Sequence, residues 1–221
     1  MVSLVQWFRG VCAQRGRFFV PLKYRDLPPA AVRELRDEDF TACETIYRAN
    51  EALTVPGGYF EDFSQWLRHR RATIVVVEVN GVIIAFGGVS ISLSERVALA
   101  ALTYGVVDPH YQGQGYGTLL LLARLCMLPK SAKRWTVMMT TTDTSKHFFA
   151  RFGFTFFRAL PDKLGIVRET HWTAVSNDWL RACAHIMRGS TFSARLMEDE
   201  IRPIANLGDA PPGERTADDR Q

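Results

Sequence analysis

Apolar residues recur along this chain at two different spacings, which alternate from residue 32 onward. Alternating or continuous apolar runs, which are typical of β-strands, cover residues 32–36, 72–79, 82–91, 96–107, 135–141, 154–158 and 166–175. Apolar residues at the helical spacing of three and four fall within residues 37–50, 59–71, 119–127, 145–152 and 176–187. We therefore expect an α/β protein in which helices flank a central sheet of about seven strands.

The longest apolar stretch, residues 72–93, is interrupted by Glu78 and by the pair Asn80 and Gly81. It is long enough for a membrane-spanning helix. However, the stretch is rich in β-branched residues, and Asn-Gly is the strongest short signal for a β-hairpin turn. The pattern favours two strands joined by a tight turn over a membrane span.

One glycine-rich segment, VDPHYQGQGYGT at residues 107–118, separates a predicted strand from a predicted helix. Pro109 lacks the N–H that a sheet ladder needs, so the strand should end there. Gly113, Gly115 and Gly117 allow tight turns and a close approach of the backbone to a ligand. The N–H groups of a helix's first turn have no partner within the helix and carry the positive end of its dipole. The segment therefore predicts a cradle for phosphate.

Two common phosphate loops do not fit this segment. A dinucleotide fingerprint needs G-x-G-x-x-G and a P-loop needs Gly-Lys-Ser/Thr, and residues 107–118 contain neither. The segment resembles instead the pyrophosphate loop of the GNAT superfamily of N-acetyltransferases, V-x-P-x-x-[QR]-x-x-G-x-[GA]. The matching residues are Val107, Pro109, Gln112, Gly115 and Gly117.

The resemblance covers residues 32–175 and implies a GNAT-type α/β (α+β) fold with a mixed, mostly antiparallel sheet. It also implies acetyl-CoA as co-substrate, held in a cleft between two splayed strands with its pyrophosphate on the glycine-rich loop. The residues that would bind it are Gly105, Val106, Val107, Gln112, Gly113, Gln114, Gly115, Tyr116, Gly117 and Thr118. Because glycine is a poor strand residue, Gly105 indicates a bulge at which strands 96–107 and 135–141 part. We expect this to leave Val106 and Val107 with unpaired backbone groups.

Acetyl transfer to an amine sets three chemical requirements. A lysine-like amine has a pKa of about 10.4 and must lose a proton before it attacks, whereas a thiol with a pKa of about 8.5 is a fair leaving group. The tetrahedral oxyanion needs a donor, and the resemblance assigns that role to the backbone N–H of Val107 or of its neighbours Gly105 and Val106. Tyr104 is a candidate acid or water-holding group, although a partly buried strand tyrosine without a catalytic role fits the pattern too.

Residues 145–152 depart from the pattern of the family. Many members carry a tyrosine that protonates the thiolate, and Phe149 stands at that position here. The subclass that acetylates ribosomal proteins carries a glutamate where this chain has Val137. Two interpretations follow. The first is an acetyl-CoA-dependent N-acetyltransferase that acts on a primary amine, and the second is a CoA-binding pseudoenzyme or regulatory module.

In the GNAT fold the first two helices cover the acceptor site, here residues 37–50 and 59–71. Tyr59 is therefore a candidate substrate-binding residue, and a small-molecule or peptide amine is the expected partner. Lys146 is a candidate contact for the phosphates of CoA, although surface lysines are usually only solvated.

Composition adds limits on ligands and location. The 221-residue chain has a net charge of +4 and a pI of about 9.0, which suits an anionic cofactor as well as nucleic acid. Since the loop resembles a CoA site, no nucleic-acid partner is expected. Cys12, Cys43, Cys126 and Cys183 are scattered without a C-x-x-C pair, which argues against a zinc site and against a disulfide framework. We expect no metal and a reducing, cytoplasmic location.

The chain extends beyond the matched region at both ends. Residues 1–31 are a basic extension and linker with an amphipathic helical pattern at its beginning, and residues 32–176 form the N-acetyltransferase domain. Residues 177–206 are a helical extension, and the polar residues 207–221 are predicted to be disordered. The first helix either docks on its own domain or lies on a membrane surface, so a membrane-surface protein is a third class to consider.

Overall fold

The computed structural model describes residues 16–51, 58–94, 97–189 and 191–192, and its strands form one sheet. The strand order is β6-β7-β5-β4-β3-β2-β1-β8. Neighbouring strands run antiparallel except for β4 with β5 and β1 with β8, which are parallel. The strands are β1 (Ala31–Glu34), β2 (Thr73–Val79), β3 (Val82–Leu93), β4 (Ala98–Val107), β5 (Arg134–Thr141), β6 (Thr155–Pro161), β7 (Val167–Ser176) and β8 (Thr191–Phe192).

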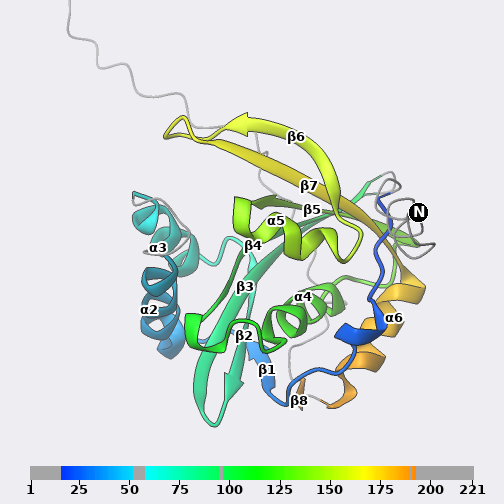
Figure 1. Ribbon diagram of the computed structural model, residues 1–221, viewed down its shortest axis with the longest axis horizontal. Helices are drawn as coiled ribbons and strands as arrows, with labels where there is room; N and C mark the ends of the chain where they lie inside the picture. The colour runs from blue at the N-terminus through cyan, green and yellow to red at the C-terminus, as the bar shows by residue number, and fades with distance from the viewer. Residues whose placement is uncertain (1–15, 52–57, 95–96, 190, 193–221) are drawn as a thin grey trace, which may run out of the picture.

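Helices cover both faces of this sheet, with α2 and α3 on one side and α4, α5 and α6 on the other (Figure 1). The helices are α2 (Phe40–Glu51), α3 (Phe60–Arg68), α4 (Tyr116–Cys126), α5 (Asp143–Ala150) and α6 (Asn177–Ile186). Short 3-10 turns are η1 (Leu22–Tyr24), η2 (Asp37–Asp39), η3 (Pro109–Tyr111) and η4 (Met187–Gly189). Because α4 lies between the sheet and α6, it is apolar on nearly every side.

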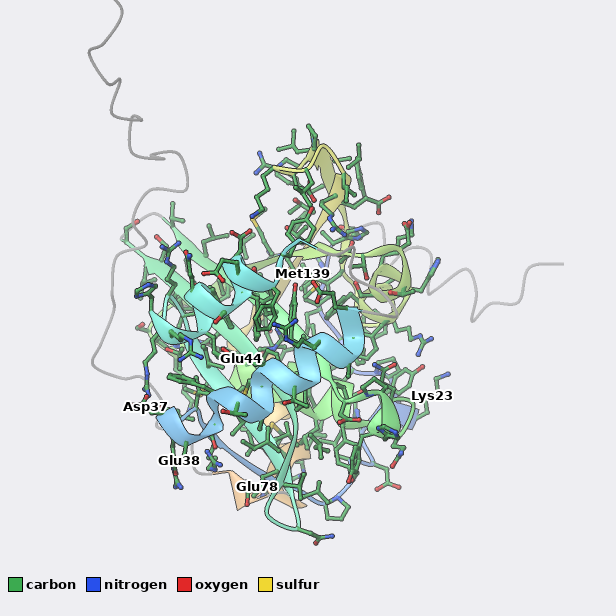
Figure 2. The ribbon with its side chains drawn as sticks, turned by 90° about the vertical axis from the view of Figure 1, so that its left-hand side faces the viewer. Lys23, Asp37, Glu38, Glu44, Glu78 and Met139 are labelled. Carbon is green, nitrogen blue, oxygen red and sulfur yellow. The ribbon has the colours of Figure 1, made fainter. Side chains whose placement is uncertain are left out.

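The beginning of α2 is tied to β1 by a buried carboxylate. Asp39 accepts hydrogen bonds from the N–H of Arg36 (2.7 Å) and from both terminal nitrogens of Arg33 (2.6 and 3.0 Å). Burial opposes the charge of Asp39, but these donors outweigh it and lower the pKa of the carboxyl group. Figure 2 looks onto α2, with Asp37 and Glu38 in the η2 turn before it and Glu44 within the helix.

The GNAT-type sheet predicted from the sequence is confirmed. Strands β2 and β3 form the expected hairpin, and Asn80 and Gly81 have φ angles of 51° and 79°, as a tight two-residue turn requires. Strand β8 was not predicted, because a two-residue strand leaves no periodic pattern. None of the helices in the described part of the chain is long and apolar enough to cross a membrane.

Residues 16–20, at the end of the predicted basic extension, pack on the domain. The N–H of Phe18 donates to the carbonyl of Ala174 (3.0 Å), the N–H of Phe19 donates to that of Phe152 (3.2 Å), and the Phe18 ring is buried. The amphipathic pattern of residues 1–12, the loop 54–57 and the tail 207–221 lie outside the described residues.

Candidate active site

The two halves of β4 have different neighbours. The register pairs Leu99 through Leu102 with Thr136 through Met139 of β5, and the pairing then ends. Pairing with β3 on the other side continues to Val107. Within the described ranges, β4 therefore has no strand on its β5 side beyond Leu102. The predicted parting of the two strands is confirmed, and the last paired residue, Leu102, lies three residues before Gly105.

A bulge marks the start of the unpaired half. Opposite Gly87 of β3, strand β4 places two residues, Tyr104 and Gly105. The left-handed backbone lies at Tyr104, with a φ of 42°, and not at Gly105. At Gly105 a Cβ would lie 2.8 Å from a terminal nitrogen of Arg124, so a larger residue there would require the guanidinium to move. A left-handed tyrosine is a strained feature of the kind that concentrates at functional sites.

The carbonyl at the end of β4 is held by two side chains. The carbonyl of Val107 accepts hydrogen bonds from the amides of Asn50 (3.1 Å) and Gln112 (3.1 Å), and Gln112 also donates to Asn50 (2.9 Å). The prediction that Val106 and Val107 both leave their backbone groups unpaired is therefore wrong. Val106 lies in the ladder with β3, and the carbonyl of Val107 is doubly bonded.

The N–H of Val107 still fits the role predicted for it. The N–H of Asp108 donates to the carbonyl of Ile84 on β3 (2.8 Å). Because successive backbone groups of a strand point to opposite sides, the N–H of Val107 points away from β3, toward the side that has no strand.

The glycine-rich loop presents a row of free backbone donors. The N–H groups of Thr118 and Leu119 donate to the carbonyl of Gly115 (3.0 Å each). Those of residues 113–117 form no hydrogen bond within the described part of the chain. Five successive amides at the beginning of α4 are thus available to an anion.

The three glycines of the loop differ in what they require. Gly113 and Gly115 have φ angles of 76° and 95°, which favour glycine. A Cβ on Gly115 would also approach Pro28 to 3.0 Å. Gly117 has no left-handed backbone, and a Cβ there would make ordinary contacts with Phe148 at 3.6 Å. Only the first two glycines are demanded by the local geometry.

Tyr104 belongs to an aromatic cluster on the α2 and α3 side of the sheet. Its ring centroid lies 4.6 Å from that of Trp66, 5.3 Å from that of Phe63 and 6.1 Å from that of Tyr47. Burial, aided by the charge of Asp62, raises the pKa of Tyr104. The hydroxyl therefore keeps its proton at neutral pH and is a donor there.

Tyr59 bridges two elements on the side predicted for the acceptor. Its hydroxyl donates to Asp162 at the turn between β6 and β7, and Nε of Arg168 donates to the same carboxylate (2.9 Å). Lys163 pairs with Asp62 of α3. These five residues form a clasp between α3 and the β6–β7 hairpin, whose turn lies near α3 (Figure 1).

Phe149 packs as an ordinary aromatic residue. Its ring centroid lies 4.8 Å from that of Phe148 and 5.5 Å from that of Phe154. Helix α5, which carries it, begins two residues before the predicted start because Thr142 and Ser145 cap each other's backbone N–H. The tyrosine hydroxyl of the family pattern has no counterpart at this position.

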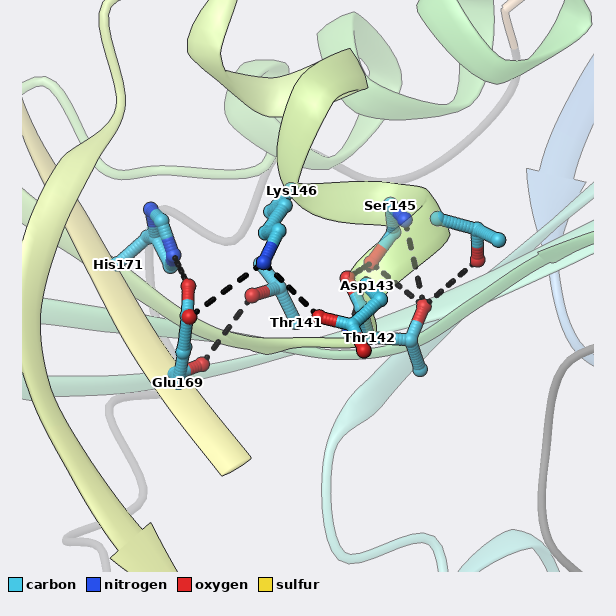
Figure 3. A network of polar contacts seen from close by, with 8 residues as sticks. Thr141, Thr142, Asp143, Ser145, Lys146, Glu169 and His171 are labelled. Atoms are coloured by element: carbon cyan, nitrogen blue, oxygen red, sulfur yellow. Dashed lines mark hydrogen bonds and ion pairs between the residues drawn. The ribbon is translucent and has the colours of Figure 1, made fainter. Parts of the chain in front are cut away.

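A polar network joins α5 to β7 (Figure 3). Nζ of Lys146 contacts Asp143 (2.9 Å) and Glu169 (3.5 Å), and Glu169 contacts Nε2 of His171 (2.9 Å). The hydrogen bond with His171 is the main cause of the lowered pKa of Glu169. The charge of Lys146 is thus already met by two carboxylates, which would compete with a CoA phosphate for it.

Arg124 is a residue of this region that the sequence reasoning missed. Its guanidinium fills the space beside Gly105, although it belongs to the otherwise apolar α4. The available signal was a single charge within an apolar helical run. Within the described ranges, no group of three or more His, Cys, Asp or Glu side chains is arranged to hold a metal ion.

Comparisons with known proteins agree with this arrangement. Residues 70–156 match the family model described as an acetyltransferase (GNAT) domain. No curated protein matches the chain. Among solved structures, Ard1 of Thermoplasma volcanium is 20% identical, with a TM-score of 0.52 over 67% of this chain and 99% of its own.

Two further solved structures have the same fold. One is yncA of Salmonella typhimurium, solved with its cofactor acetyl-CoA, at 17% identity and a TM-score of 0.50, covering 67% of this chain and 94% of that chain. The other is an Escherichia coli N-acetyltransferase of a ribosomal-protein alanine, at 19% identity and a TM-score of 0.50, covering 66% and 93%. Residues 70–156 thus match the model of the acetyltransferase (GNAT) domain, and the chain shares its fold with these acetyltransferases.

Proposed function

We propose that this protein transfers the acetyl group of acetyl-CoA to a primary amine. One observation carries the proposal: the amides of residues 113–117, which form no hydrogen bond within the described residues, follow β4 after the η3 turn, and β4 has no strand on its β5 side beyond Leu102. The amides suit the pyrophosphate, and the open edge of β4 suits the amide groups of the pantetheine arm, which can pair with it as an added strand would. The solved structure of yncA with acetyl-CoA supports this choice of ligand.

The thioester carbonyl is proposed to lie beside the N–H of Val107. That N–H points to the side of β4 without a strand, and the double hydrogen bond on the Val107 carbonyl fixes the peptide that follows it. A preorganised backbone donor of this kind contributes roughly 3–4 kcal/mol to stabilising an oxyanion. Gly105 and Val106 complete the segment that the acetyl group would approach.

The acceptor amine is proposed to enter from the α3 side, between Tyr104 and the clasp around Tyr59. Tyr104 keeps its proton at neutral pH, so it suits the role of donor better than that of base. Asp62 and Asp162 give this side of the molecule carboxylates, although each is already engaged by a cation. A cationic acceptor would be attracted to the same region.

Calorimetry with acetyl-CoA and a turnover assay test the proposal together. We expect acetyl-CoA to bind, and CoA thiol to be released in the presence of some members of a panel of alkylamines, arylamines and peptides. Desulfo-CoA serves as the control for binding through the phosphates and pantetheine alone. A chain that binds neither molecule contradicts the proposal.

A CoA-binding module without turnover is the second candidate, and Phe149 favours it. Val137, which stands at the position of a glutamate in one subclass, is buried in the core and has no catalytic group to offer. Binding of acetyl-CoA without thiol release for any amine would favour the module. The membrane-surface candidate depends on residues 1–25. Co-sedimentation with anionic vesicles, with and without residues 1–15, separates it from the other two and leaves the buried Phe18 in place.

A further inference from the structure

Arg124 is a buried cation at the point where β4 leaves β5. It projects from α4 onto the two glycines of the bulge, and its side chain lies where a Cβ of either glycine would stand. A Cβ on Gly105 would lie 2.8 and 3.0 Å from its terminal nitrogens, and one on Gly87 would lie 3.2 Å from its Cδ. The residue is 2% exposed. Two facing glycines thus provide the space that the guanidinium occupies.

The charge of Arg124 has no matching carboxylate among the described residues. Its Nε donates to the carbonyl of Leu120 (3.4 Å), and the ion pairs of the described residues do not include it. Burial lowers the pKa of Arg124 to about 10, so the side chain remains charged at neutral pH. A buried charge without a counterion destabilises a fold, and an apolar residue of similar size would be more favourable there.

The opposite side of the Gly105 peptide is open. Gly105 is exposed, although Arg124 fills one face of it. The exposed side belongs to the half of β4 that β5 does not cover. A negative charge that formed on the open side of Gly105 would therefore face the buried guanidinium of Arg124 across that peptide, with less water between the two charges than in a surface ion pair.

We propose that Arg124 is a positioning residue for acyl transfer, whose charge acts across the Gly105 peptide to stabilise the CoA thiolate as it leaves. The proposal rests on the proposed function, in the form that places the thioester beside Gly105, the neighbour of Val107 that is also a candidate donor for the oxyanion. It also accounts for the absence of an acid at Phe149, since a stabilised thiolate can leave without being protonated.

The reaction balances without a further reagent. The lone pair of the neutral amine forms the N–C bond with the acetyl carbonyl carbon, and the C–S bond breaks. Its electron pair goes to sulfur, giving a thiolate. The proton lost by the amine nitrogen goes to water. The products are an amide, the CoA thiolate and a proton.

Other ionisable groups around α4 do not account for the charge of Arg124. Strand β3 carries none, Glu78 of β2 is paired with Arg33, and Tyr104 of β4 turns to the opposite face of the sheet. Cys126 of α4 and Cys183 of α6 are buried, and burial raises the pKa of Cys126 to about 12 and also raises that of Cys183, so both are neutral thiols. The remaining ionisable groups on these elements are Tyr116 on α4, Asp178, Arg181 and His185 on α6, and Arg188 on η4.

The test measures the thiol pKa of bound CoA, a readout that does not need turnover. Thiolate absorbance of the CoA complex is followed against pH, with the desulfo-CoA complex as the blank that cancels tyrosines and cysteines. A free thiol titrates near about 8.5. We expect the wild-type protein to lower this value by at least about one unit, Arg124→Met to restore it, and Arg124→Lys to give an intermediate value.

Stability and kinetics separate this role from a structural one. Arg124→Met should raise the Tm, by about 2–4 °C or more, because it removes a buried unpaired charge. The same variant should lower kcat by at least about tenfold while leaving the KM for acetyl-CoA unchanged, with partial rescue in Arg124→Lys.

Three outcomes overturn the inference. If CoA binds and its thiol titrates alike in the wild type and in Arg124→Met, only the role of Arg124 fails. If neither CoA nor desulfo-CoA binds the wild-type protein, the proposed function fails together with it. If Arg124→Met unfolds while Arg124→Lys folds and shows an unshifted thiol, the guanidinium is a structural group.

Discussion

Residues 98–102 and residues 103–107 belong to one strand, β4, yet the structure uses the two halves differently. The first half lies between β3 and β5 and is bonded on both sides. The second half pairs with β3 but not with β5, and it contains a bulge and a tyrosine with a left-handed backbone. The same contrast holds beneath the strand, where the first half packs on leucines and the second lies against the guanidinium of Arg124.

This difference shows how one strand can both hold the sheet together and form a reaction site. The paired half contributes stability through burial, as Ala100 and Leu102 lie in the core. The unpaired half combines strain at Tyr104 with a buried charge, and both are costs to the fold. Substitutions in the first half should therefore change stability, and substitutions in the second half and its loop should change ligand binding or turnover.

Leu102→Ala should give the largest effect on stability. The side chain is buried in the core between the sheet and α4, so its removal should lower the free energy of unfolding by about 2–5 kcal/mol in urea denaturation. Val106→Ala, in the other half and only partly buried, should lower it by about 1 kcal/mol. The affinity of folded Leu102→Ala for acetyl-CoA should match the wild type. Equal losses of stability in the two variants would remove the contrast between the halves.

Gly115→Val should weaken acetyl-CoA binding by at least about tenfold, equivalent to about 1.4 kcal/mol, in calorimetry. The φ of 95° strains any side chain, and a Cβ meets Pro28 at 3.0 Å, so the loop amides must shift. Gly81→Val is the matched control, because Gly81 also has a left-handed φ, of 79°, but lies in the β2–β3 turn. Both variants should lose stability, and only the first should lose affinity. If Gly115→Val binds acetyl-CoA with unchanged affinity, the pyrophosphate does not bind to this loop.

The sequence predicted the paired parts of the molecule well, and the reason is physical. Strand periodicity, Asn80-Gly81 and the glycine-rich loop are local signals, and each element they predicted is present in the described residues. The bulge was predicted from Gly105, but no local pattern predicted the left-handed backbone of Tyr104. The ring of Tyr104 packs against Trp66 and Phe63, which lie far away in sequence, and a strained backbone persists only where the surrounding structure holds it.

The remaining parts of the site depend on long-range contacts that no local pattern contains. Asn50 reaches the carbonyl of Val107 across 57 positions, and Tyr59 reaches Asp162 across 103. Arg124 was visible only as a charge in an apolar helix, and its meaning depends on Gly87 and Gly105 lying beneath it. Residues that act through partners distant in the chain require the fold before they can be recognised.

Asp162→Asn should loosen the clasp between α3 and the β6–β7 hairpin. Burial opposes the charge of Asp162, but hydrogen bonds from Tyr59, Arg168 and two backbone amides outweigh it and lower its pKa to about 2. Since the folded-state pKa lies below the ordinary value of about 3.9, this stabilisation is present above about pH 4 and is lost as the pH falls through about 2.

Hydrogen exchange at the hairpin measures the effect. The amides of Leu164 and Ile166 donate to Asp162 (2.9 and 3.0 Å), so their exchange should quicken roughly three- to tenfold in Asp162→Asn, and in the wild type near pH 2 after correction for intrinsic rates. Asp178→Asn, which alters an exposed ion pair on α6, is the control and should leave both amides unchanged. Unaltered exchange in Asp162→Asn would show that the clasp does not depend on this carboxylate.

Phe149→Tyr should produce the smallest change, and its size tests whether the thiolate needs an acid. The ring is half-buried between Phe148 and Phe154, so one added hydroxyl should alter the free energy of unfolding by less than about 1 kcal/mol. A general acid that chemistry requires is worth about a hundredfold or more in rate. If the leaving thiolate is already stabilised, restoring the tyrosine should raise kcat by less than about threefold, well short of that figure.

Phe149→Leu is the matched control, and its pH–rate profile should keep the shape of the wild-type profile, because phenylalanine has no proton to give. A hundredfold gain in Phe149→Tyr would mean that thiolate departure limits the wild-type reaction and that the unpaired half of β4 does not stabilise the leaving group. If Phe149→Leu loses the pH dependence of its rate, the ring of Phe149 positions a titrating group. Helix α5 would then take part in the chemistry, and the assignment of packing to α5 and of chemistry to β4 would be wrong.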